Sequence, residues 1–463
     1  MFRQAEGAGR LLKAGKENEI SGEQINYFRE FLRSRGIKEE DILIFTTFKT
    51  GNHRKKLLML SNYLSSITPP AVLDIEHLNT VTRSYPGIIT GTYHIYRGHA
   101  RIMTFQKGTP PFFDEGSGGI DVDENGVPAF SRFEEVRFTF SHAEGISGKN
   151  PCALYVHGTG GTAFTVFEDL SALNMNARGI SVMSFDSPLH GERMPDHWDP
   201  TFTFFNFMNL IAARDNIRET ALEIHQFITL LMNFKIDSQI NPDGKLVECD
   251  PEKILFMGHS QGAITGIPYL GVDHRTKGAV ISGGGGVLIY SLIHKSQPFP
   301  IQPLLRVLFG KSEELQPYHL LLNIFQIFFE PSDPAVYAPF VVYDEELSPE
   351  PVNLFVSEGM EDGFTPPETA ESLCGAGLWP QVEPVSRLIP LYRIDTYRIV
   401  HSSPVKGNFL TPAGERATVG FIQFPGEGHF ALFDSPCGYS MWGNFFQSLI
   451  HSEPVIDTSC LNQ

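Results

Sequence analysis

Short apolar segments alternate with helical stretches over the last two thirds of the chain. Buried strands are predicted at residues 153–156, 180–185, 254–257, 279–281, 352–356 and 421–424. Residues 209–234 carry apolar side chains three and four positions apart, as on one face of a long helix. Apolar strands separated by crossover helices are typical of a mostly parallel sheet covered on both faces. We therefore predict a doubly wound α/β fold for residues 136–463.

The first 135 residues have a different pattern. Ser21 and Gln24 form a capping box that opens a helix to about Arg33, and a second helix is predicted at 55–67. Strands are predicted at 41–45, as a pair within 85–107, and at 135–140. We expect a small N-terminal α+β module over residues 1–135, without a recognisable chemical motif.

Residues 286–345, between the fourth and fifth predicted strands, are apolar and largely helical. Leucines and phenylalanines dominate this insertion, as in the stretch Leu320-Leu321-Leu322-Asn323-Ile324-Phe325. Two interpretations remain open. The insertion either completes the core with crossover helices, or forms a lid or cap that lines a pocket for an acyl group.

Charge and composition exclude several classes of protein. The chain has 53 acidic and 36 basic residues, a formal charge of −17, which argues against nucleic acid or an anionic membrane as the main partner. Hydrophobic residues make up 41% of the chain, enough to bury a core. No apolar run is long enough to span a membrane, and residues 1–18 lack the apolar segment of a signal peptide. The sequence as written predicts a cytoplasmic protein, with export or surface anchoring open if the true start lies upstream.

The cysteines and one acidic loop predict no metal site. The five cysteines, at positions 152, 249, 374, 437 and 460, are odd in number and widely spaced, so we expect inert thiols without a disulfide framework. Residues 121–126 begin like a calcium loop, but its twelfth position is Arg132 rather than a glutamate. A hairpin turn at Asn125 and Gly126 is favoured instead.

The sequence Gly258-His259-Ser260-Gln261-Gly262 follows a predicted buried strand and opens a predicted helix. Small residues on both sides of Ser260 allow the sharp strand-to-helix turn that exposes a nucleophilic hydroxyl at the end of a strand. The backbone N–H of Gln261 and the positive end of the helix then face the same point. Ser260 is therefore the candidate nucleophile.

A glycine-rich loop, His157-Gly158-Thr159-Gly160-Gly161, follows the first predicted strand of the α/β region. Its glycines allow the loop to point an N–H group, that of Thr159, toward the nucleophile. Thr159 and Gln261 are therefore the candidate oxyanion-hole donors. A phosphate-binding loop is excluded because no Gly-Lys-Ser/Thr follows.

An acid and a base follow two later strands, in the chain order Ser, Asp, His. Asp362 is the candidate acid, with Glu358 and Glu361 as alternatives. His429, in a glycine-flanked loop after the last strand, is the candidate base, and His401 is the alternative. An acid at this place orients the imidazole and stabilises its charged form.

These four segments resemble the α/β-hydrolase superfamily over about residues 140–452. The resemblance implies that Ser260 is the nucleophile, Asp362 the acid and His429 the base. The stretch from Asp186 to Arg193 is similar to a D-x-P-x-H-G-x-R loop of many bacterial esterases, which implies structural roles for both residues. The two glycine motifs, residues 329–334 and the N-terminal module also resemble bacterial lipase/esterase-like proteins of the virulence-factor lipase type. Such proteins are often exported or lipid-anchored, and this chain shows no such signal.

The predicted activity is a serine hydrolase that cleaves carboxylic esters of apolar acyl chains through an acyl-enzyme. Neither a metal nor an organic cofactor is needed for this chemistry. The expected partner is a small-molecule or lipid ester, and no nucleic acid or integral membrane span is expected. A peptidase or thioesterase on the same scaffold remains an alternative, because a triad alone does not select the leaving group. A binding protein on an inactive hydrolase fold is the rival from another class, but no catalytic residue or glycine is missing.

Overall fold

The computed structural model describes residues 22–38, 51–195, 198–310, 314–348, 350–390, 399–451 and 453–462. The chain divides into two compact units, residues 1–52 and 53–463. In the first unit the structure describes helix α2 (Gly22–Arg35), which ends at Gly36 in a left-handed conformation. The predicted helix is present, whereas its capping residue Ser21 and the strand expected at 41–45 lie outside the described residues.

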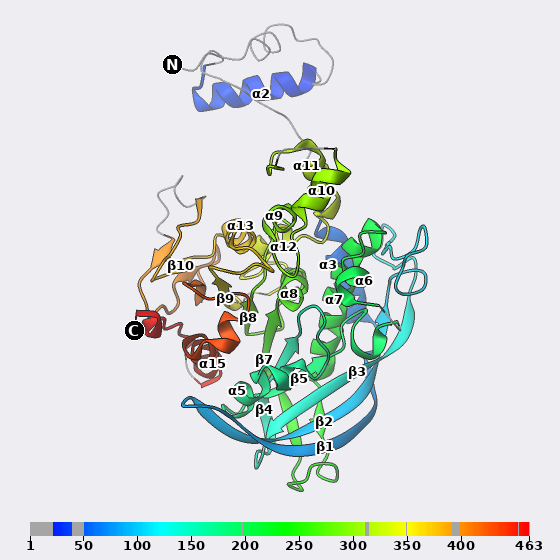
Figure 1. Cartoon of the computed structure of the whole chain (residues 1–463), viewed down its shortest axis with the longest axis vertical. Coiled ribbons are helices and arrows are strands. Elements are labelled where there is room, and N and C mark those ends of the chain that lie inside the picture. The colour runs from blue at the N-terminus through cyan, green and yellow to red at the C-terminus, as the bar shows by residue number, and fades with distance from the viewer. Residues whose placement is uncertain are drawn as a thin grey trace. The chain divides into compact units, whose positions relative to one another are not determined.

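A mostly parallel sheet forms the centre of the second unit (Figure 1). Its strand order is β1-β2-β3-β5-β4-β7-β8-β9-β14-β10-β11, and β6 pairs with β7. Pairing is antiparallel from β1 to β5 and parallel from β5 to β11. The first strands are β1 (Ala71–Tyr85), β2 (Ile89–Thr104), β3 (Arg132–Ala143), β4 (Gly148–Val156), β5 (Ser181–Phe185), β6 (Lys235–Ile236) and β7 (Val247–His259). The others are β8 (Gly278–Ser282), β9 (Asn353–Gly359), β10 (Gln381–Val382), β11 (Val400–His401) and β14 (Val419–Phe424), with a separate hairpin of β12 (Phe409–Leu410) and β13 (Arg416–Ala417).

Helices cover both faces of this sheet, so the predicted doubly wound α/β fold is confirmed. The helices up to the insertion are α3 (Lys55–Ser66), α4 (Thr165–Glu168), α5 (Ser171–Asn176), α6 (Pro200–Phe204), α7 (Leu210–Leu231) and α8 (Gln261–Leu270). The later ones are α9 (Ile289–His294), α10 (Gln302–Leu308), α11 (Leu320–Phe329), α12 (Pro334–Tyr337), α13 (Pro367–Gly377), α14 (Ala431–Asp434) and α15 (Pro436–His451). Short 3₁₀ turns occur at Gly191–Arg193, Ala338–Phe340 and Ser459–Asn462. Within the ranges described above, none of these helices is both long and apolar enough to cross a membrane.

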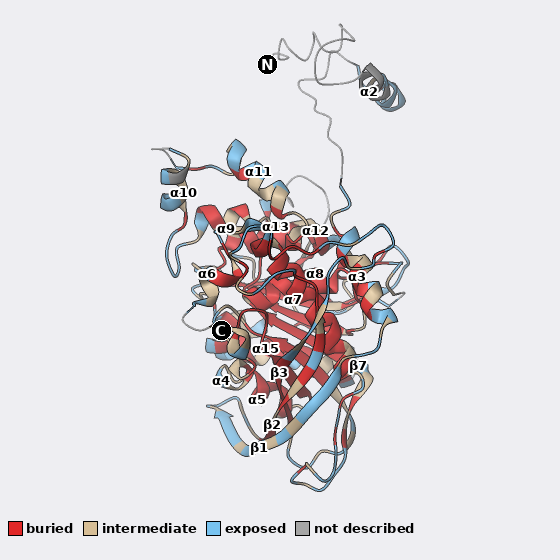
Figure 2. Cartoon of the chain, turned by 90° about the vertical axis from the view of Figure 1, so that its right-hand side faces the viewer, coloured by how far each residue is buried: buried red, intermediate tan, exposed pale blue. Residues whose placement is uncertain are grey.

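Alternation along the central strands explains why both faces need covering. In β4, Leu154 and Val156 point into the cluster formed with α3, α7, α8 and α13, while Ala153 and Tyr155 point into the cluster formed with α5 and α15. Successive side chains of a strand lie on opposite faces, so an entirely apolar strand needs helices on both sides. Figure 2 shows this buried layer running through the sheet, α7 and α8.

The strands before residue 136 belong to the same sheet. The boundary expected at 135/136 falls inside β3, which pairs with β2 on one side and with β5 of the predicted α/β region on the other. The sequence pattern also missed most of β1, because this edge strand is largely exposed and carries polar residues on both faces. A separate module up to residue 135 is therefore not what the described residues form.

One part of the insertion 286–345 forms a cap, and another part completes the core, so each of the two interpretations holds for a part of it. Helices α9, α10 and α11 pack around a small cluster of their own that includes Leu292, Ile301 and Leu322. The segment after them joins the main core, where Tyr337 and Val341 are fully buried. The first part is thus a cap on the sheet, and the last part completes the core.

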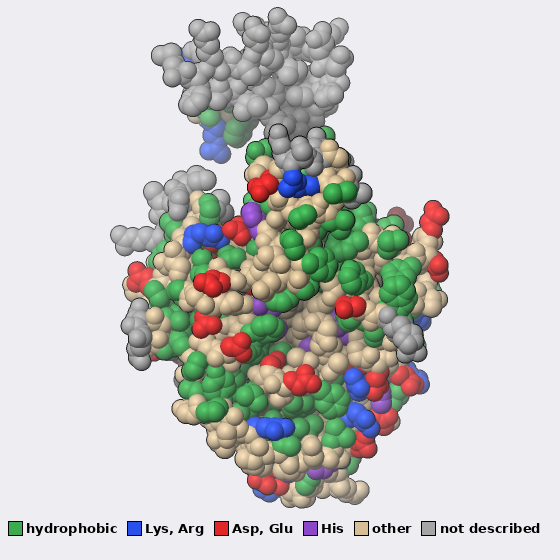
Figure 3. Space-filling model, in the orientation of Figure 1, with side chains coloured by type: hydrophobic (Ala, Val, Ile, Leu, Met, Phe, Trp, Pro, Cys, Tyr) green, Lys and Arg blue, Asp and Glu red, His purple; other side chains and the backbone are tan. Residues whose placement is uncertain are grey.

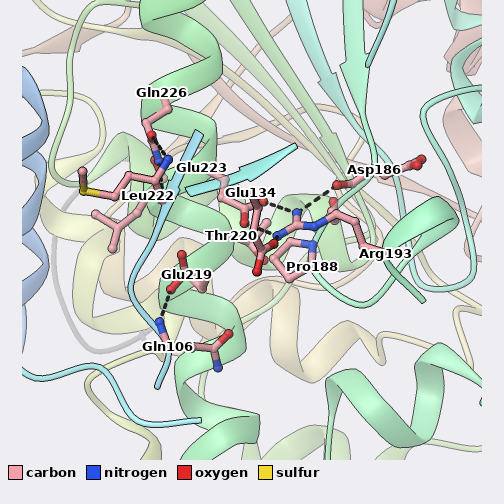
Figure 4. A network of polar contacts seen from close by, with 12 residues as sticks. Gln106, Glu134, Asp186, Pro188, Arg193, Glu219, Thr220, Leu222, Glu223 and Gln226 are labelled. Carbon is pink, nitrogen blue, oxygen red and sulfur yellow. Dashed lines mark hydrogen bonds and ion pairs between the residues drawn. The ribbon is translucent and has the colours of Figure 1, made fainter. Parts of the chain in front are cut away.

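A buried ion network holds the loop after β5 against α7 (Figure 4). The Arg193 guanidinium donates two hydrogen bonds of 2.7 Å to Glu223 of α7 and one of 2.8 Å to Glu134 of β3. Glu219, one turn before Glu223, accepts backbone N–H groups of Phe105 and Gln106 at 3.0 and 3.1 Å. Burial, reinforced by the Glu223 charge, raises the pKa of Glu219 well above its usual range. Arg193 is therefore the main compensating charge for this acidic cluster.

The neighbouring Asp186 has a structural role of the same kind, as the resemblance implied. Its carboxylate accepts the backbone N–H groups of Ala163 at 2.8 Å and Glu192 at 3.0 Å. A Cβ on Gly191 would lie 2.2 Å from that carboxylate, so the loop closes only around a glycine.

The cysteines correct the sequence-based expectation of free thiols. Cys152 is bonded to Cys249, and Cys437 is bonded to Cys460, so Cys374 is the buried cysteine outside both disulfides. The first pair links β4 to β7, which are adjacent in the sheet but separated by 97 residues in sequence. Spacing along the chain cannot reveal such a pair, because strand order rather than sequence distance brings the two thiols together.

The acidic loop at residues 121–128 is a turn. The Asp123 carboxylate accepts the N–H groups of Asn125 and Val127, each at 2.9 Å, and Val122 bridges Pro128. Gly126 has a φ of 84°, the conformation that the hairpin interpretation required.

Replacing Arg193 with methionine should destabilise the protein strongly. The change leaves Glu223 without its buried counter-charge, a loss that typically costs about 3–5 kcal/mol, whereas Glu134 keeps its ion pair with Arg132. Urea unfolding at pH 7 measures it. The matched control is Arg97→Met, which removes an exposed ion pair with Glu76 and should cost less than about 1 kcal/mol. Equal effects of the two changes would contradict the network's structural role.

Thiol titration should distinguish the four disulfide-bonded cysteines from Cys374. In denaturant without reductant we expect one reactive thiol, from Cys374, and after reduction all five. Cys152→Ser should also lower the melting temperature, because a crosslink over 97 residues restricts the unfolded chain by about 4–5 kcal/mol in the chain-entropy model. Five reactive thiols in oxidatively purified protein would refute the pairing.

Candidate active site

Ser260 lies at a sharp turn between β7 and α8. Its φ of 55° and ψ of −117° place it in a region that residues other than glycine rarely occupy. Such a conformation costs about 1–3 kcal/mol and persists only where the surroundings enforce it. Here the Ser260 N–H donates to the Ser282 carbonyl of β8 at 2.8 Å, and the first turn of α8 closes on the Ser260 carbonyl.

The flanking glycines are required by close backbone packing. A Cβ on Gly258 would lie 2.4 Å from the Gly262 carbonyl oxygen, and one on Gly262 would lie 2.0 Å from the Val156 carbonyl oxygen of β4. The end of β4 therefore passes directly against the turn. The loop carrying Thr159 is in contact as well, since a Cβ on Gly158 would lie 3.0 Å from the Ser260 Cβ.

The structure brings Asp362 and His429 together. Asp362 follows β9, His429 follows β14, and the His429 Nδ1 lies 2.6 Å from the Asp362 Oδ2. The other Asp362 oxygen accepts the N–H groups of Phe364 and Thr365, each at 2.8 Å. Both side chains are buried, so the carboxylate is fixed and can hold the imidazole in one orientation.

The alternative acids and the alternative base lie elsewhere. Glu358 is buried on β9 and accepts a hydrogen bond from the Gln423 side chain at 2.7 Å, and burial raises its pKa well above the usual range. Glu361 is exposed. His401 belongs to the edge strand β11. Of these candidates, Asp362 is the acid that contacts His429.

The segment after β8 lies between Ser260 and His429. Ser282 accepts the Ser260 N–H, and a Cβ on the next residue, Gly283, would lie 3.0 Å from the His429 Cε1. Ser260 and His429 line the same cavity. The parallel strands β7, β8 and β14 thus place Ser260 and His429 at the carboxyl-terminal ends of the strands, on the same side of the sheet.

His259 packs beside His429, with ring centroids 4.8 Å apart. Burial, together with the nearby His429, lowers the pKa of His259 well below its usual range. His259 is therefore neutral at pH 7, and a positive charge on His429 meets no like charge from it. Phe364 and Phe430 complete the wall around the His429 ring.

Thr159 and Gln261, the candidate oxyanion-hole residues, are in direct contact. The Thr159 hydroxyl donates to the Gln261 side-chain oxygen at 2.9 Å. Gln261 is the first residue of α8, where backbone N–H groups have no partner within the helix. Both residues line the cavity with Ser260.

The cavity measures about 310 Å³ and has a mainly apolar lining. The cap contributes one side of its wall: Leu288, Ser291, Leu292, Lys295, Pro298, Phe299, Ile301, Phe325 and Phe329. Residues near α6 and the start of α7 form the other side: Thr201, Phe205, Phe207, Leu210, Ala213 and Ile217. The insertion therefore does line the pocket.

Sequence reasoning missed this second wall and the polar residues of the cap. Nothing in the pattern separated Phe205 or Leu210 from ordinary core residues, because their proximity to Ser260 depends on how α7 crosses the sheet. Ser291 and Lys295 could have been noticed as polar positions four apart in a mostly apolar stretch. In the described ranges, no group of three His, Cys, Asp or Glu side chains is arranged to hold a metal ion.

Several solved structures are similar to this chain at low sequence identity. Acetyl xylan esterase 1 from Thermoanaerobacterium sp. JW/SL YS485 is 13% identical, with a TM-score of 0.45, over 87% of this chain and 95% of that chain. An acetyl xylan esterase from Paenibacillus sp. R4 is 15% identical, with a TM-score of 0.47, over 88% and 96%. A glucuronoyl esterase from Solibacter usitatus is 11% identical, with a TM-score of 0.42, over 86% and 91%. Identities and TM-scores this low say nothing about the substrate.

No curated protein matches the chain. The model of the alpha/beta hydrolase family matches residues 153–439, more than half of the sequence. This range begins in β4 and ends in α15, and it includes Ser260, Asp362 and His429. The chain belongs to the alpha/beta hydrolase family.

Proposed function

We propose that this protein is a serine hydrolase that cleaves carboxylic esters with apolar acyl groups. One observation carries the proposal: Ser260, on its strained turn, lines the same apolar cavity as His429, and Asp362 holds His429 at 2.6 Å. A positioned base beside a serine hydroxyl is the arrangement that makes serine nucleophilic.

In the proposed reaction, the Ser260 hydroxyl attacks the ester carbonyl while His429 accepts its proton. The tetrahedral intermediate collapses, and His429 returns the proton to the departing alcohol. Water, activated by His429, then releases the acid from the acyl-enzyme and regenerates the Ser260 hydroxyl. Asp362 stays ionised throughout and stabilises the imidazolium that forms twice in each cycle.

In the tetrahedral intermediate, the backbone N–H groups of Thr159 and Gln261 are assigned to stabilise the negative charge on the former carbonyl oxygen. The N-terminal end of α8 adds the positive end of a helix dipole at the same place. The side-chain contact between the two residues supports this role, because it fixes the two peptide units relative to each other. A single donor of this kind typically contributes about 3–4 kcal/mol to the transition state.

The apolar lining favours an ester with a hydrophobic acyl chain over a peptide. Aromatic and aliphatic side chains from the cap and from α6–α7 face the cavity, and a peptide backbone would find few partners there. Further hydrophobic side chains are exposed on the outside of the same region, among them Leu304, Val307, Leu320, Ile324 and Met208 (Figure 3). A thioesterase activity uses the same residues and is a second outcome of the substrate tests below.

The two disulfides indicate the compartment in which the protein is located. Cys152–Cys249 and Cys437–Cys460 are the kind of crosslink that forms in oxidising compartments. We therefore propose an extracytoplasmic location, in place of the cytoplasmic one that the sequence as written predicts. The thiol titration described above tests the premise.

Ser260→Ala should abolish hydrolysis of p-nitrophenyl esters. Loss of the nucleophile should lower kcat by a factor on the order of 10⁴–10⁶, because no acyl-enzyme can form. Labelling by a fluorophosphonate probe should disappear with it. The matched control is Ser372→Ala on α13, which removes a hydroxyl that bonds only to its own helix and should keep both activity and labelling.

Two results would contradict the proposal. One is a wild-type protein that neither hydrolyses an ester or thioester nor reacts with the fluorophosphonate. The other is wild-type activity that survives in the Ser260→Ala protein. The first result would favour a binding protein on the hydrolase fold.

The ratio of activities on long and short esters should depend on the cap. Each buried methylene contributes about 0.8 kcal/mol, so kcat/KM should rise at least tenfold between the two-carbon and the eight-carbon p-nitrophenyl esters. Phe325→Ala, in the cavity wall, should reduce that rise. Phe130→Ala, on an exposed loop, should leave it unchanged. A flat profile in the wild type would show that the cavity does not hold the acyl chain.

A further inference from the structure

Lys295 places a positive charge in an apolar cavity. Among the described residues that line the cavity, it is the single lysine or arginine, next to Leu292, Phe299 and Phe364. The residue directly follows α9, and Ser291, one turn earlier, lines the same wall. Burying an ammonium group among apolar side chains costs free energy unless an opposite charge compensates it. The group therefore requires an explanation beyond packing.

The backbone around Lys295 is fixed to the loop that carries Asp362. The N–H groups of Ser296 and Gln297 both donate to the Gly363 carbonyl, at 3.0 and 2.9 Å. A Cβ on Gly363 would lie 2.5 Å from the Ser296 Oγ and 3.0 Å from the Gln297 Cγ, so the two segments pack closely at this glycine. The Lys295 ammonium itself donates to the Phe364 carbonyl at 3.0 Å. The charge is thus held in place before any substrate binds.

Among the residues that the structure describes, none supplies a dedicated counter-charge to the ammonium group. In the part of the chain that the structure describes, no carboxylate lies within ion-pair distance of it. Asp362 acts on it from further away, but that carboxylate is already bonded to His429 and to two backbone N–H groups. Burial lowers the pKa of Lys295, and the Asp362 charge acts in the opposite direction. An ammonium has three N–H donors, and the Phe364 carbonyl occupies one.

We propose that Lys295, with Ser291 one turn earlier on the same wall, binds an anionic group of the substrate. The substrate class is then an ester that carries a carboxylate in addition to its apolar part. This inference rests on the proposed ester hydrolysis and narrows it. An anion seated at Lys295 supplies the missing counter-charge, and a rigid donor loses little entropy on binding it. Lys295 is in this sense a specificity-determining residue and not a catalytic one.

The experiment compares esters that differ only in a terminal carboxylate. On the acyl side the pair is mono-p-nitrophenyl adipate and p-nitrophenyl hexanoate. On the alcohol side it is 4-(butanoyloxy)benzoate and 4-methylphenyl butanoate. The readout is the ratio of kcat/KM for the anionic ester to that for the neutral ester, measured for the wild type, Lys295→Met, Lys295→Arg and Lys149→Met. Lys149 is exposed at the opposite end of β4 and controls for the loss of one positive charge.

Lys295→Met should lower this ratio at least tenfold in one of the two pairs, and that pair identifies which side of the ester carries the anion. Lys295→Arg should retain most of the wild-type ratio, because it keeps the charge, and Lys149→Met should not change it. KM for the anionic ester should rise more than kcat falls, as expected for lost binding.

Other outcomes overturn the inference. An unchanged ratio in both pairs would mean that no anion binds at Lys295. An equal fall in kcat for anionic and neutral esters would mean that Lys295 only holds the Asp362 loop through Phe364. In both cases ester hydrolysis and fluorophosphonate labelling persist in the wild type, so the proposed function stands. Absence of both in the wild type would overturn the two proposals together.

Discussion

The turn at Ser260 is the constraint on which the rest of the site depends. A serine with a φ of 55° is strained. The strain is maintained because β4, β8 and α8 all contact the backbone of this turn. Glycines at 258 and 262 allow backbone to pass within a distance that no side chain would permit. The Thr159 loop and the Ser282 carbonyl are positioned by the same contacts. The geometry of the candidate nucleophile is thus a property of the sheet rather than of the motif alone.

The cap and the acid loop form one unit through Gly363 and Phe364. Backbone hydrogen bonds join Ser296 and Gln297 to the loop that also presents two N–H groups to Asp362, and the Lys295 side chain adds a third hydrogen bond. The wall of the cavity and the orientation of His429 are therefore not independent. Because the first two contacts are between backbone groups, changes in cap side chains can alter the cavity without moving Asp362. This arrangement permits substrate preference to vary while the geometry of Asp362 and His429 is kept.

Much of the α/β fold could be predicted because buried parallel strands are continuous apolar runs. The six strands predicted after residue 150 are present, as is the long helix α7. The edge strand β1 was not recognised, since an exposed antiparallel strand has no apolar run to detect. For the site, the motif context selected Ser260, Asp362 and His429, and the structure brings Asp362 against His429 and places Ser260 and His429 on one cavity. The acid remained ambiguous in the sequence because three carboxylates lie within five residues, and one contact separates them.

The sequence by itself determined the elements and the local chemistry: apolar runs, glycine positions, and a serine, an acid and a histidine after successive strands. Those features depend on neighbours along the chain, where sterics and periodicity act. The tertiary structure alone decided the pairing of Cys152 with Cys249, the compensation of Glu223 by Arg193, and the presence of Lys295 in the cavity. Each of these joins segments far apart in sequence. The order of the strands and the crossing of the helices set the distances between these segments. No local sequence pattern predicts the strand order or the helix crossing.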